Sequence, residues 1–281
     1  MERPTHFLLD NDGVMRRENL QLPGVPEFYA ALTRLGIRHV LLSNNSRVTS
    51  EGLVDQMRAF GVSDFSREQA MTSAEGTAAF LREHPSENMG VFLVGEEGLH
   101  SAVRAEGISV VNDHWDAQRL DWQAEPPTDV AVGFHTSVDW RKELAPAYNA
   151  IAEQRARFIG TNPDKTYRHS SGLRLPANGS TLDFFQSTGK EPIIVSKPEI
   201  GMAEAALHRM GACKEHAAVA VVGDTIDQDM WLAENLRRAG WRAEGWLVLS
   251  GDVRREEVSP ATPVGRVFED IRAITRKLLS R

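Results

Sequence analysis

The chain has 281 residues, enough for one large domain or two modest domains, and in either case enough to bury a sizeable core. Hydrophobic residues make up 41% of it, which is ordinary for a globular protein and excludes wholesale disorder. Because 39 acidic residues outnumber 32 lysines and arginines and give a formal net charge of -7, binding to nucleic acid or to an anionic membrane through overall charge is not expected.

Short apolar runs alternate with stretches of helical period from the first residues onward. A strand is expected at 7–9, followed by a helix at 25–35 whose apolar residues recur on one face. A second strand is expected at 40–42 and a second helix at 49–60, and each helix is followed by a glycine that would end it.

The middle and the end of the chain repeat this pattern. Strands are expected at 91–94, 130–134, 158–160, 193–195, 217–222 and 246–249. Helices are expected at 98–105 and 139–154, and three more helices are expected to end at 210, to end at 239 and to begin at 269. Two polar, proline-bearing stretches at 113–128 and 162–178 interrupt the series, and irregular segments of this length are often functional. The alternation predicts parallel strands covered by helices, so the fold class is α/β.

The sequence also bears on the protein's environment. It contains no run of 18 apolar residues, so a soluble protein is expected, and residues 1–9 lack the features of a signal peptide. The single cysteine, Cys213, is unable to form an intrachain disulfide and is typical of a reducing compartment. A cytoplasmic location is therefore expected.

Polar residues directly follow four of the predicted strands. They are Asp-Asn-Asp-Gly at 10–13, Ser-Asn-Asn-Ser at 43–46, Lys-Pro at 197–198 and Gly-Asp-Thr-Ile-Asp-Gln-Asp at 223–229. Each alone is explained equally well as a turn, a helix cap or a solvated lysine. However, the carboxyl ends of parallel strands share one edge of the sheet, so these carboxylates, the lysine and a hydroxyl are expected to converge there.

This combination of groups points to phosphoryl transfer. Crowded carboxylates repel one another unless a cation lies between them, and magnesium takes one or two carboxylates together with waters and a substrate phosphate. One aspartate could then attack phosphorus, while a second, two residues along, exchanges a proton with the leaving oxygen and with water. A lysine and backbone amides at a helix start would neutralise the phosphoryl oxygens.

Competing motifs do not fit the residues. An EF-hand loop would need a ligand at Val14 and a glycine at Met15. The sequence has no GxGxxG after a strand, no GxxxxGK[ST] and no HExxH, and its nine histidines show no metal-ligand spacing.

The sequence resembles the haloacid dehalogenase (HAD) superfamily of phosphatases, specifically its NagD-like, p-nitrophenyl phosphatase branch. The motifs that carry the resemblance lie, in order, at 10–14, 23–27, 43–46, 197–198 and 223–229. The resemblance implies a Rossmann-like parallel-sheet core, formed by residues 1–72 and 189–281, with a large inserted α/β cap domain at 73–188. It also implies magnesium (Mg2+) as cofactor and a possible homodimer through the cap.

The resemblance further implies the roles of individual residues. Asp10 would be the nucleophile and a magnesium ligand, and Asp12 the general acid/base and a ligand through its backbone carbonyl. Asp224 would be the third ligand, and Asp229 would orient the groups around the metal.

The remaining residues of the shared motifs would contact the phosphate. Ser43 and the backbone of Asn44 and Asn45 would hold the phosphoryl group, and Lys197 would bridge Asp10 and phosphate.

Three departures from the family pattern stand out. Met15 and Arg16 occupy positions where relatives often carry an apolar residue and an aromatic. Ser196 replaces a glycine commonly found before the lysine, and Ala177 replaces a glycine of the relatives' Pro-Gly-x-Gly. Neither of these last two removes a catalytic side chain, and each would cost stability only if its backbone required a positive φ.

The expected substrate is a small phosphorylated metabolite such as phosphoglycolate, a sugar phosphate or a nucleotide monophosphate, cleaved through an aspartyl phosphate. The cap segment at 162–169, which includes Asp164, resembles the family's substrate-facing loop, and a second anionic group of the substrate would meet Arg16, Lys165 or Arg168. The alternatives are a phosphatase of phosphoproteins or of pyridoxal phosphate-type cofactors, a phosphotransferase, and a catalytically silent ligand-binding relative.

Overall fold

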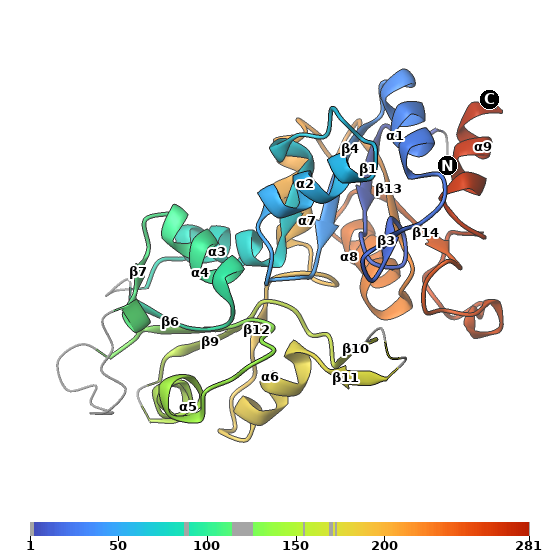
Figure 1. Cartoon of the computed structure of the whole chain (residues 1–281). Coiled ribbons are helices and arrows are strands. Elements are labelled where there is room, and N and C mark those ends of the chain that lie inside the picture. Colours follow the sequence, from blue (N-terminus) through green and yellow to red (C-terminus); the bar gives the residue numbers. More distant parts are fainter. Residues whose placement is uncertain are drawn as a thin grey trace. The chain divides into compact units, whose positions relative to one another are not determined.

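A computed structural model describes residues 3–86, 90–113, 126–153, 155–168, 171 and 173–280. The chain divides into two compact units. The first consists of Met1–Ser43, Ser50–Met71 and Lys197–Arg281, and the second of Asn44–Thr49 and Thr72–Ser196. Each unit is built on its own parallel sheet (Figure 1), which confirms the α/β class expected from the sequence.

The sheet of the first unit has six strands in the order β15-β14-β13-β1-β4-β5. Their bounds are β1 His6–Leu9, β4 Arg38–Ser43, β5 Ala70–Thr72, β13 Ala218–Gly223, β14 Arg242–Val248 and β15 Arg266–Phe268. In the centre, Leu9 of β1 lies in register with Val222 of β13 and Leu41 of β4, and all three strands run parallel. Their carboxyl ends therefore lie at the same edge of the sheet.

Alternate residues of β1 supply the two faces of this sheet. Leu8 belongs to a core cluster that contains Leu207 and Leu232 of two helices, whereas Phe7 contacts Phe28 and Trp246, the latter from β14. The helices of this unit are α1 Val25–Arg34, α2 Ser50–Ala59, α7 Gly201–Arg209, α8 Trp231–Arg238 and α9 Ile271–Leu279, with 3-10 turns at Arg67–Gln69 and Arg255–Glu257 and a π-helical turn at Ile226–Met230. Between β1 and α1 lies a small antiparallel pair, β2 Arg16–Arg17 and β3 Leu20–Gln21.

The second unit repeats the architecture with a five-stranded parallel sheet in the order β12-β9-β8-β6-β7. Its strands are β6 Gly90–Val94, β7 Ser109–Val110, β8 Asp129–Val132, β9 Arg157–Gly160 and β12 Ile193–Ile194, and an antiparallel hairpin is formed by β10 Thr166–Arg168 and β11 Arg174–Pro176. Phe92 packs with Ile151 and Phe185 on one face of the sheet, and the adjacent Leu93 packs with Leu99 on the other. The helices are α3 Ser73–Glu83, α4 Glu97–Ala105, α5 Ala145–Ala152 and α6 Asn178–Gln186, with a 3-10 turn at Val111–Asp113 and a π-helical turn at Trp140–Leu144.

The units differ in three places from the division 1–72/189–281 and 73–188 expected from the sequence, and the smallest difference is Thr72, which belongs to the second unit. Residues 189–196 belong to the second unit, because β12 pairs with β9 of its sheet. Residues 44–49 also belong to that unit, although they directly follow β4 of the first.

The sequence also missed some elements. The helices α3 and α6 were not expected, and the segment 162–178, expected to be irregular, contains the hairpin β10–β11. Most of the other predicted loop, residues 114–125, lies outside the described residues. None of the helices in the described ranges is long and apolar enough to cross a membrane.

Candidate active site

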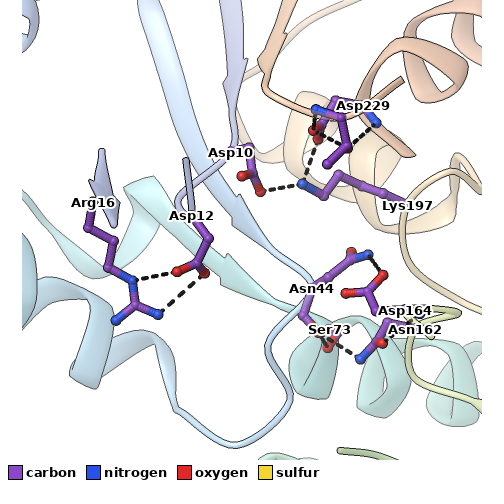
Figure 2. Close-up of polar contacts among 10 residues, drawn as sticks. Asp10, Asp12, Arg16, Asn44, Ser73, Asn162, Asp164, Lys197 and Asp229 are labelled. Carbon is purple, nitrogen blue, oxygen red and sulfur yellow. Dashed lines mark hydrogen bonds and ion pairs between the residues drawn. The ribbon is translucent and has the colours of Figure 1, made fainter. Parts of the chain in front are cut away.

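The carboxyl edge of the first sheet holds a buried lysine between two aspartates (Figure 2). Asp10 follows β1, and its backbone N–H donates to the carbonyl of Val222 at 2.8 Å. Lys197 Nζ donates to Asp10 Oδ1 and, at 2.7 Å, to Asp229 Oδ1. The side chains of Lys197 and Asp229 are only 3% and 2% exposed. The structure thus brings Lys197 into contact with Asp10, 187 positions away in sequence, and with Asp229, 32 positions away.

A third carboxylate completes an acidic cluster. Asp224 is the first residue after β13, and one carboxylate oxygen each from Asp10, Asp224 and Asp229 lie within 4.8 Å of one another. Burial raises the pKa of Asp10 to about 7, an effect increased by the nearby charges of Asp229 and Asp12 and opposed by Lys197. Burial and the charges of Asp10 and Asp229 also raise the pKa of Asp224 well above its ordinary value.

Lys197 keeps its charge in this environment. Burial alone would lower the pKa of its ammonium group, but the carboxylates of Asp10 and Asp229 raise it above the usual range of a lysine. Within the described residues, the cluster thus combines the cation of Lys197, paired with Asp10 and Asp229, with three carboxylates, and it carries an excess of negative charge when all of them are ionised.

The oxygens of the cluster are not equally engaged. Asp229 Oδ1 accepts from Lys197, and Asp229 Oδ2 accepts from the Thr225 hydroxyl at 2.6 Å. Asp224 Oδ2 accepts from the backbone N–H of Asp252 at 3.1 Å. Within the part of the chain that the structure describes, Asp10 Oδ2 and Asp224 Oδ1 have no such partner. Asp224 Oδ1 suits a hard cation, which prefers oxygen ligands. Asp10 Oδ2 is available to a cation or to a reacting atom.

Two glycines allow the loops around Asp224 to pack closely. Gly13 has φ +78°, and a Cβ added there would lie 2.1 Å from Asp224 Oδ2. A Cβ on Gly251 would lie 1.8 Å from the same oxygen. Both loops therefore approach this carboxylate with backbone alone.

We expect Gly13→Ala to damage the site, because it imposes a strained φ and displaces the Asp224 carboxylate. The predicted loss is about 1–3 kcal/mol in the free energy of unfolding and most of the turnover. Urea unfolding measures the first effect and an activity assay measures the second. Gly36→Ala is the control, because Gly36 also has a positive φ, +64°, but a Cβ there would meet nothing within 4 Å. Equal loss of activity in both variants would contradict the role given to the Asp224 contact.

Asp12 lies beside the cluster but is more accessible. Its side chain is 55% exposed and forms an ion pair with Arg16, whose Nε and Nη2 donate to Asp12 Oδ1 and Oδ2 at 2.8 and 3.3 Å (Figure 2). Ser43, the last residue of β4, is buried in the first unit.

Asn44 and Asn45 belong to the second unit, where Asn44 joins a polar network. Its side-chain amide donates to Asp164 Oδ1 at 3.3 Å, and its carbonyl accepts from the Ser73 hydroxyl at 2.7 Å and from the Asn162 amide at 2.8 Å. Asn45 Oδ1 accepts from the backbone N–H of Arg47 at 2.9 Å. The segment after β4 is thus anchored by Asp164 and Asn162, which belong to the expected substrate-facing segment, and by Ser73, to which the sequence assigned no role.

The other residues expected in the substrate-facing loop lie in the same unit. Lys165 forms an exposed ion pair with Asp183 of α6. Arg168 ends β10, and its side chain lies outside the described residues.

The two departures at glycine positions cause no backbone strain. Neither Ala177 nor Ser196 has a positive φ, so neither position requires glycine. The glycine that matters in this segment is Gly179, where a Cβ would lie 2.3 Å from the carbonyl oxygen of Pro163.

Two residues that hold the acidic cluster were given no role from the sequence. Thr225 caps the π-helical turn at Ile226–Met230 and holds Asp229, and its position four residues earlier is a recognisable capping signal. Asp252 acts through its backbone N–H, for which the sequence contains no signal.

Comparison with known proteins agrees with the fold. Residues 7–109 match the family described as haloacid dehalogenase-like hydrolase, and residues 194–274 match the HAD-hydrolase-like family. The chain is 33% identical over 225 residues to a dihydroxyacetone phosphatase of Corynebacterium glutamicum, covering 80% of this chain and 75% of the relative. It is 30% identical over 261 residues to an acid sugar phosphatase of Staphylococcus aureus, covering 92% and 94%.

Solved structures align over nearly all of this chain. A p-nitrophenyl phosphatase from Archaeoglobus fulgidus aligns with a TM-score of 0.81 at 26% identity, covering 98% of this chain and 99% of that one. NagD from E. coli K-12 aligns with a TM-score of 0.79 at 27% identity, covering 95% and 97%. A glycerol phosphate phosphatase from Mycobacterium tuberculosis, solved in complex with magnesium, aligns with a TM-score of 0.80 at 25% identity, covering 96% and 76%.

The chain therefore belongs to the haloacid dehalogenase-like hydrolases. Within that family it is an enzyme of the NagD-like, p-nitrophenyl phosphatase branch.

Proposed function

We propose that this protein is a magnesium-dependent phosphomonoester hydrolase that acts on small phosphorylated metabolites through an aspartyl phosphate on Asp10. The observation that carries the proposal is the buried Lys197, which holds one oxygen of Asp10 and leaves the other, Oδ2, without a partner among the described residues. A carboxylate oriented in this way has one oxygen fixed and one available to attack phosphorus.

The chain's own residues would carry out two half-reactions. In the first, Asp10 Oδ2 forms a bond to phosphorus, the bond to the leaving oxygen breaks, and a proton from the Asp12 carboxyl goes to that oxygen. In the second, Asp12 takes a proton from a water molecule whose oxygen attacks phosphorus, and the bond between phosphorus and Asp10 breaks to release inorganic phosphate. Lys197, Ser43 and the backbone of Asn44 and Asn45 would bind the phosphoryl oxygens.

The donor set fits magnesium. Asp10 and Asp224 would supply carboxylate oxygens and Asp12 its backbone carbonyl, while Asp229, whose two oxygens are engaged by Lys197 and Thr225, would orient its neighbours rather than bind the metal. When bound, the cation neutralises charge on the phosphoryl oxygens and on the crowded carboxylates.

The second unit would act as a cap that selects the substrate. We place Asp164, Lys165 and Arg168 at its substrate-facing loop, with a second anionic group of the substrate near the cationic residues. The names of the relatives, which include dihydroxyacetone, acid sugar and glycerol phosphate phosphatases, favour short polar alcohols as leaving groups. A homodimer through the cap and a cytoplasmic location also stay predictions.

The proposal is tested by measuring phosphate release from a panel of esters with magnesium and with chelator. The panel contains dihydroxyacetone phosphate, glycerol phosphate, phosphoglycolate, sugar phosphates and p-nitrophenyl phosphate, together with a phosphoserine peptide and pyridoxal phosphate. We expect turnover of the small metabolites to vanish in chelator and to return with magnesium. A preference for the phosphopeptide or for pyridoxal phosphate would instead support a bulkier substrate.

The metal ligands are tested in the same assay by Asp224→Asn. We expect it to reduce turnover at saturating magnesium by about 10²–10³-fold, whereas the same substitution of the exposed Asp55 on α2 leaves turnover unchanged. Magnesium is also expected to raise the melting temperature of the wild type, on the order of 5 °C at about 100 times the dissociation constant, and not that of Asp224→Asn. Chelator-resistant turnover would contradict the magnesium requirement.

A further inference from the structure

Among the described residues, one side chain, that of Arg16, holds the Asp12 carboxylate. This carboxylate accepts from Arg16 Nε at 2.8 Å and from Arg16 Nη2 at 3.3 Å, one bond to each oxygen. Within the described ranges no other group forms a hydrogen bond or ion pair with this carboxylate, although its side chain is 55% exposed. Among the described residues, it is therefore Arg16 that sets the direction in which Asp12 points (Figure 2).

Arg16 itself is fixed by the backbone. It lies on β2, where it pairs with Gln21 of β3, and its carbonyl accepts from the backbone N–H of Gly13 at 2.8 Å. Its own N–H donates to the Asn11 carbonyl at 3.1 Å, and its side chain is 19% exposed. Because its backbone is fixed in this way, the planar guanidinium restrains both the direction and the rotation of the carboxylate that it binds, which a lysine ammonium does not do.

We propose that Arg16 is a positioning residue that aims the Asp12 carboxyl at the leaving oxygen. The inference rests on the proposed function, in which the bond between phosphorus and the leaving oxygen breaks, its electron pair stays on that oxygen, and Asp12 supplies the proton. An unrestrained Asp12 would spend less time within reach of the leaving oxygen, so proton transfer would slow while substrate binding stayed the same.

This role differs from the one expected from the sequence, in which Arg16 meets a second anionic group of the substrate. Two of the three guanidinium nitrogens already donate to Asp12. The two roles predict different substrates to be affected. Aiming Asp12 matters most for leaving groups that need a proton, such as the alkoxide of glycerol phosphate, and least for p-nitrophenolate, which leaves without one. Binding a second anion matters most for phosphoglycolate.

The test compares kcat/KM of Arg16→Gln with that of the wild type on these three substrates. We expect a fall of about tenfold on glycerol phosphate and on phosphoglycolate, and of less than about threefold on p-nitrophenyl phosphate. Arg16→Lys should recover only part of the loss. Arg17→Gln is the matched control, because Arg17 lies on the same short strand but donates to the carbonyl of Ser250 at 2.6 Å. It is expected to match the wild type.

A double-mutant cycle decides whether Arg16 acts through Asp12. In an Asp12→Asn background, Arg16→Gln should cause no further loss on glycerol phosphate. The proposal is overturned if the losses simply add, if phosphoglycolate alone is affected, or if all three substrates lose activity equally. If the wild type hydrolyses none of the substrates, or if Asp10→Asn is as active as the wild type, then it is the proposed function that has failed.

Discussion

Asp10→Asn is expected to abolish phosphate release, with a fall in kcat on the order of 10⁴-fold or more, because an amide oxygen does not attack phosphorus. Every substrate should be affected alike, since the residue would act in both half-reactions. The measurement is phosphate release at saturating magnesium, from protein preparations of matched purity. The control is Asp55→Asn, the same substitution at an exposed position on α2, which should retain wild-type turnover.

The variant is also expected to fold, which separates lost chemistry from lost structure. Lys197 keeps Asp229 as a partner, and burial raises the pKa of Asp10 to about 7 in the metal-free protein. An acid whose pKa is raised by folding contributes stability at low pH that is lost as the pH rises through the folded pKa.

The sign of that effect can be measured. In chelator, Asp10→Asn should unfold at a higher urea concentration than the wild type at pH 8, and the difference should shrink as the pH falls towards 5. Near-normal kcat in this well-folded variant would remove Asp10 from its assigned role as nucleophile.

The convergence of the site could be predicted from sequence because buried strands have a strong local signature. Polar residues directly follow an apolar run in three strands, His6–Leu9, Arg38–Ser43 and Ala218–Gly223. Parallel pairing places the carboxyl ends of these strands together. The acidic cluster therefore follows from the parallel pairing of these strands and does not depend on particular side-chain contacts.

The limits of the second unit could not be predicted in the same way. Ile193–Ile194 is a two-residue strand, too short to show a period, and its assignment depends on pairing with β9. The helix α3 starts with a capping box at Thr72 and Glu75, a signal that is present in the sequence, but its small residues give little apolar periodicity.

The partners of the reactive groups were harder still to predict. The ion pair of Asp12 with Arg16 depends on side-chain directions within one tight loop, and the contact of Asp252 with Asp224 uses only a backbone N–H. Sequence patterns report which residues are buried or polar, whereas these contacts depend on the path of the backbone.

The second large effect is expected from Lys197→Met, which removes the one ammonium between two buried carboxylates. Losing one partner of a buried ion pair costs about 3–5 kcal/mol in the free energy of unfolding, because the remaining charge stays buried without compensation. Turnover should fall by about 10²–10³-fold at the same time, since the variant also loses a cation directed at the phosphoryl group. Lys277→Met, on the exposed side of α9, is the matched control and should change neither quantity.

Stability and turnover should then respond differently to a second substitution. Lys197→Met combined with Asp229→Asn removes both members of one ion pair, so part of the lost stability should return, whereas turnover should not.

The stability that Lys197→Met alone loses should also be smaller at pH 5 than at pH 8. Lys197 lowers the pKa of Asp10, so without the lysine Asp10 is protonated more easily. Urea unfolding in chelator at both pH values and kcat/KM with magnesium give the two results. If the double variant regained turnover together with stability, the role of Lys197 would be to stabilise the fold through its ion pairs with Asp10 and Asp229, and not to bind the phosphoryl group.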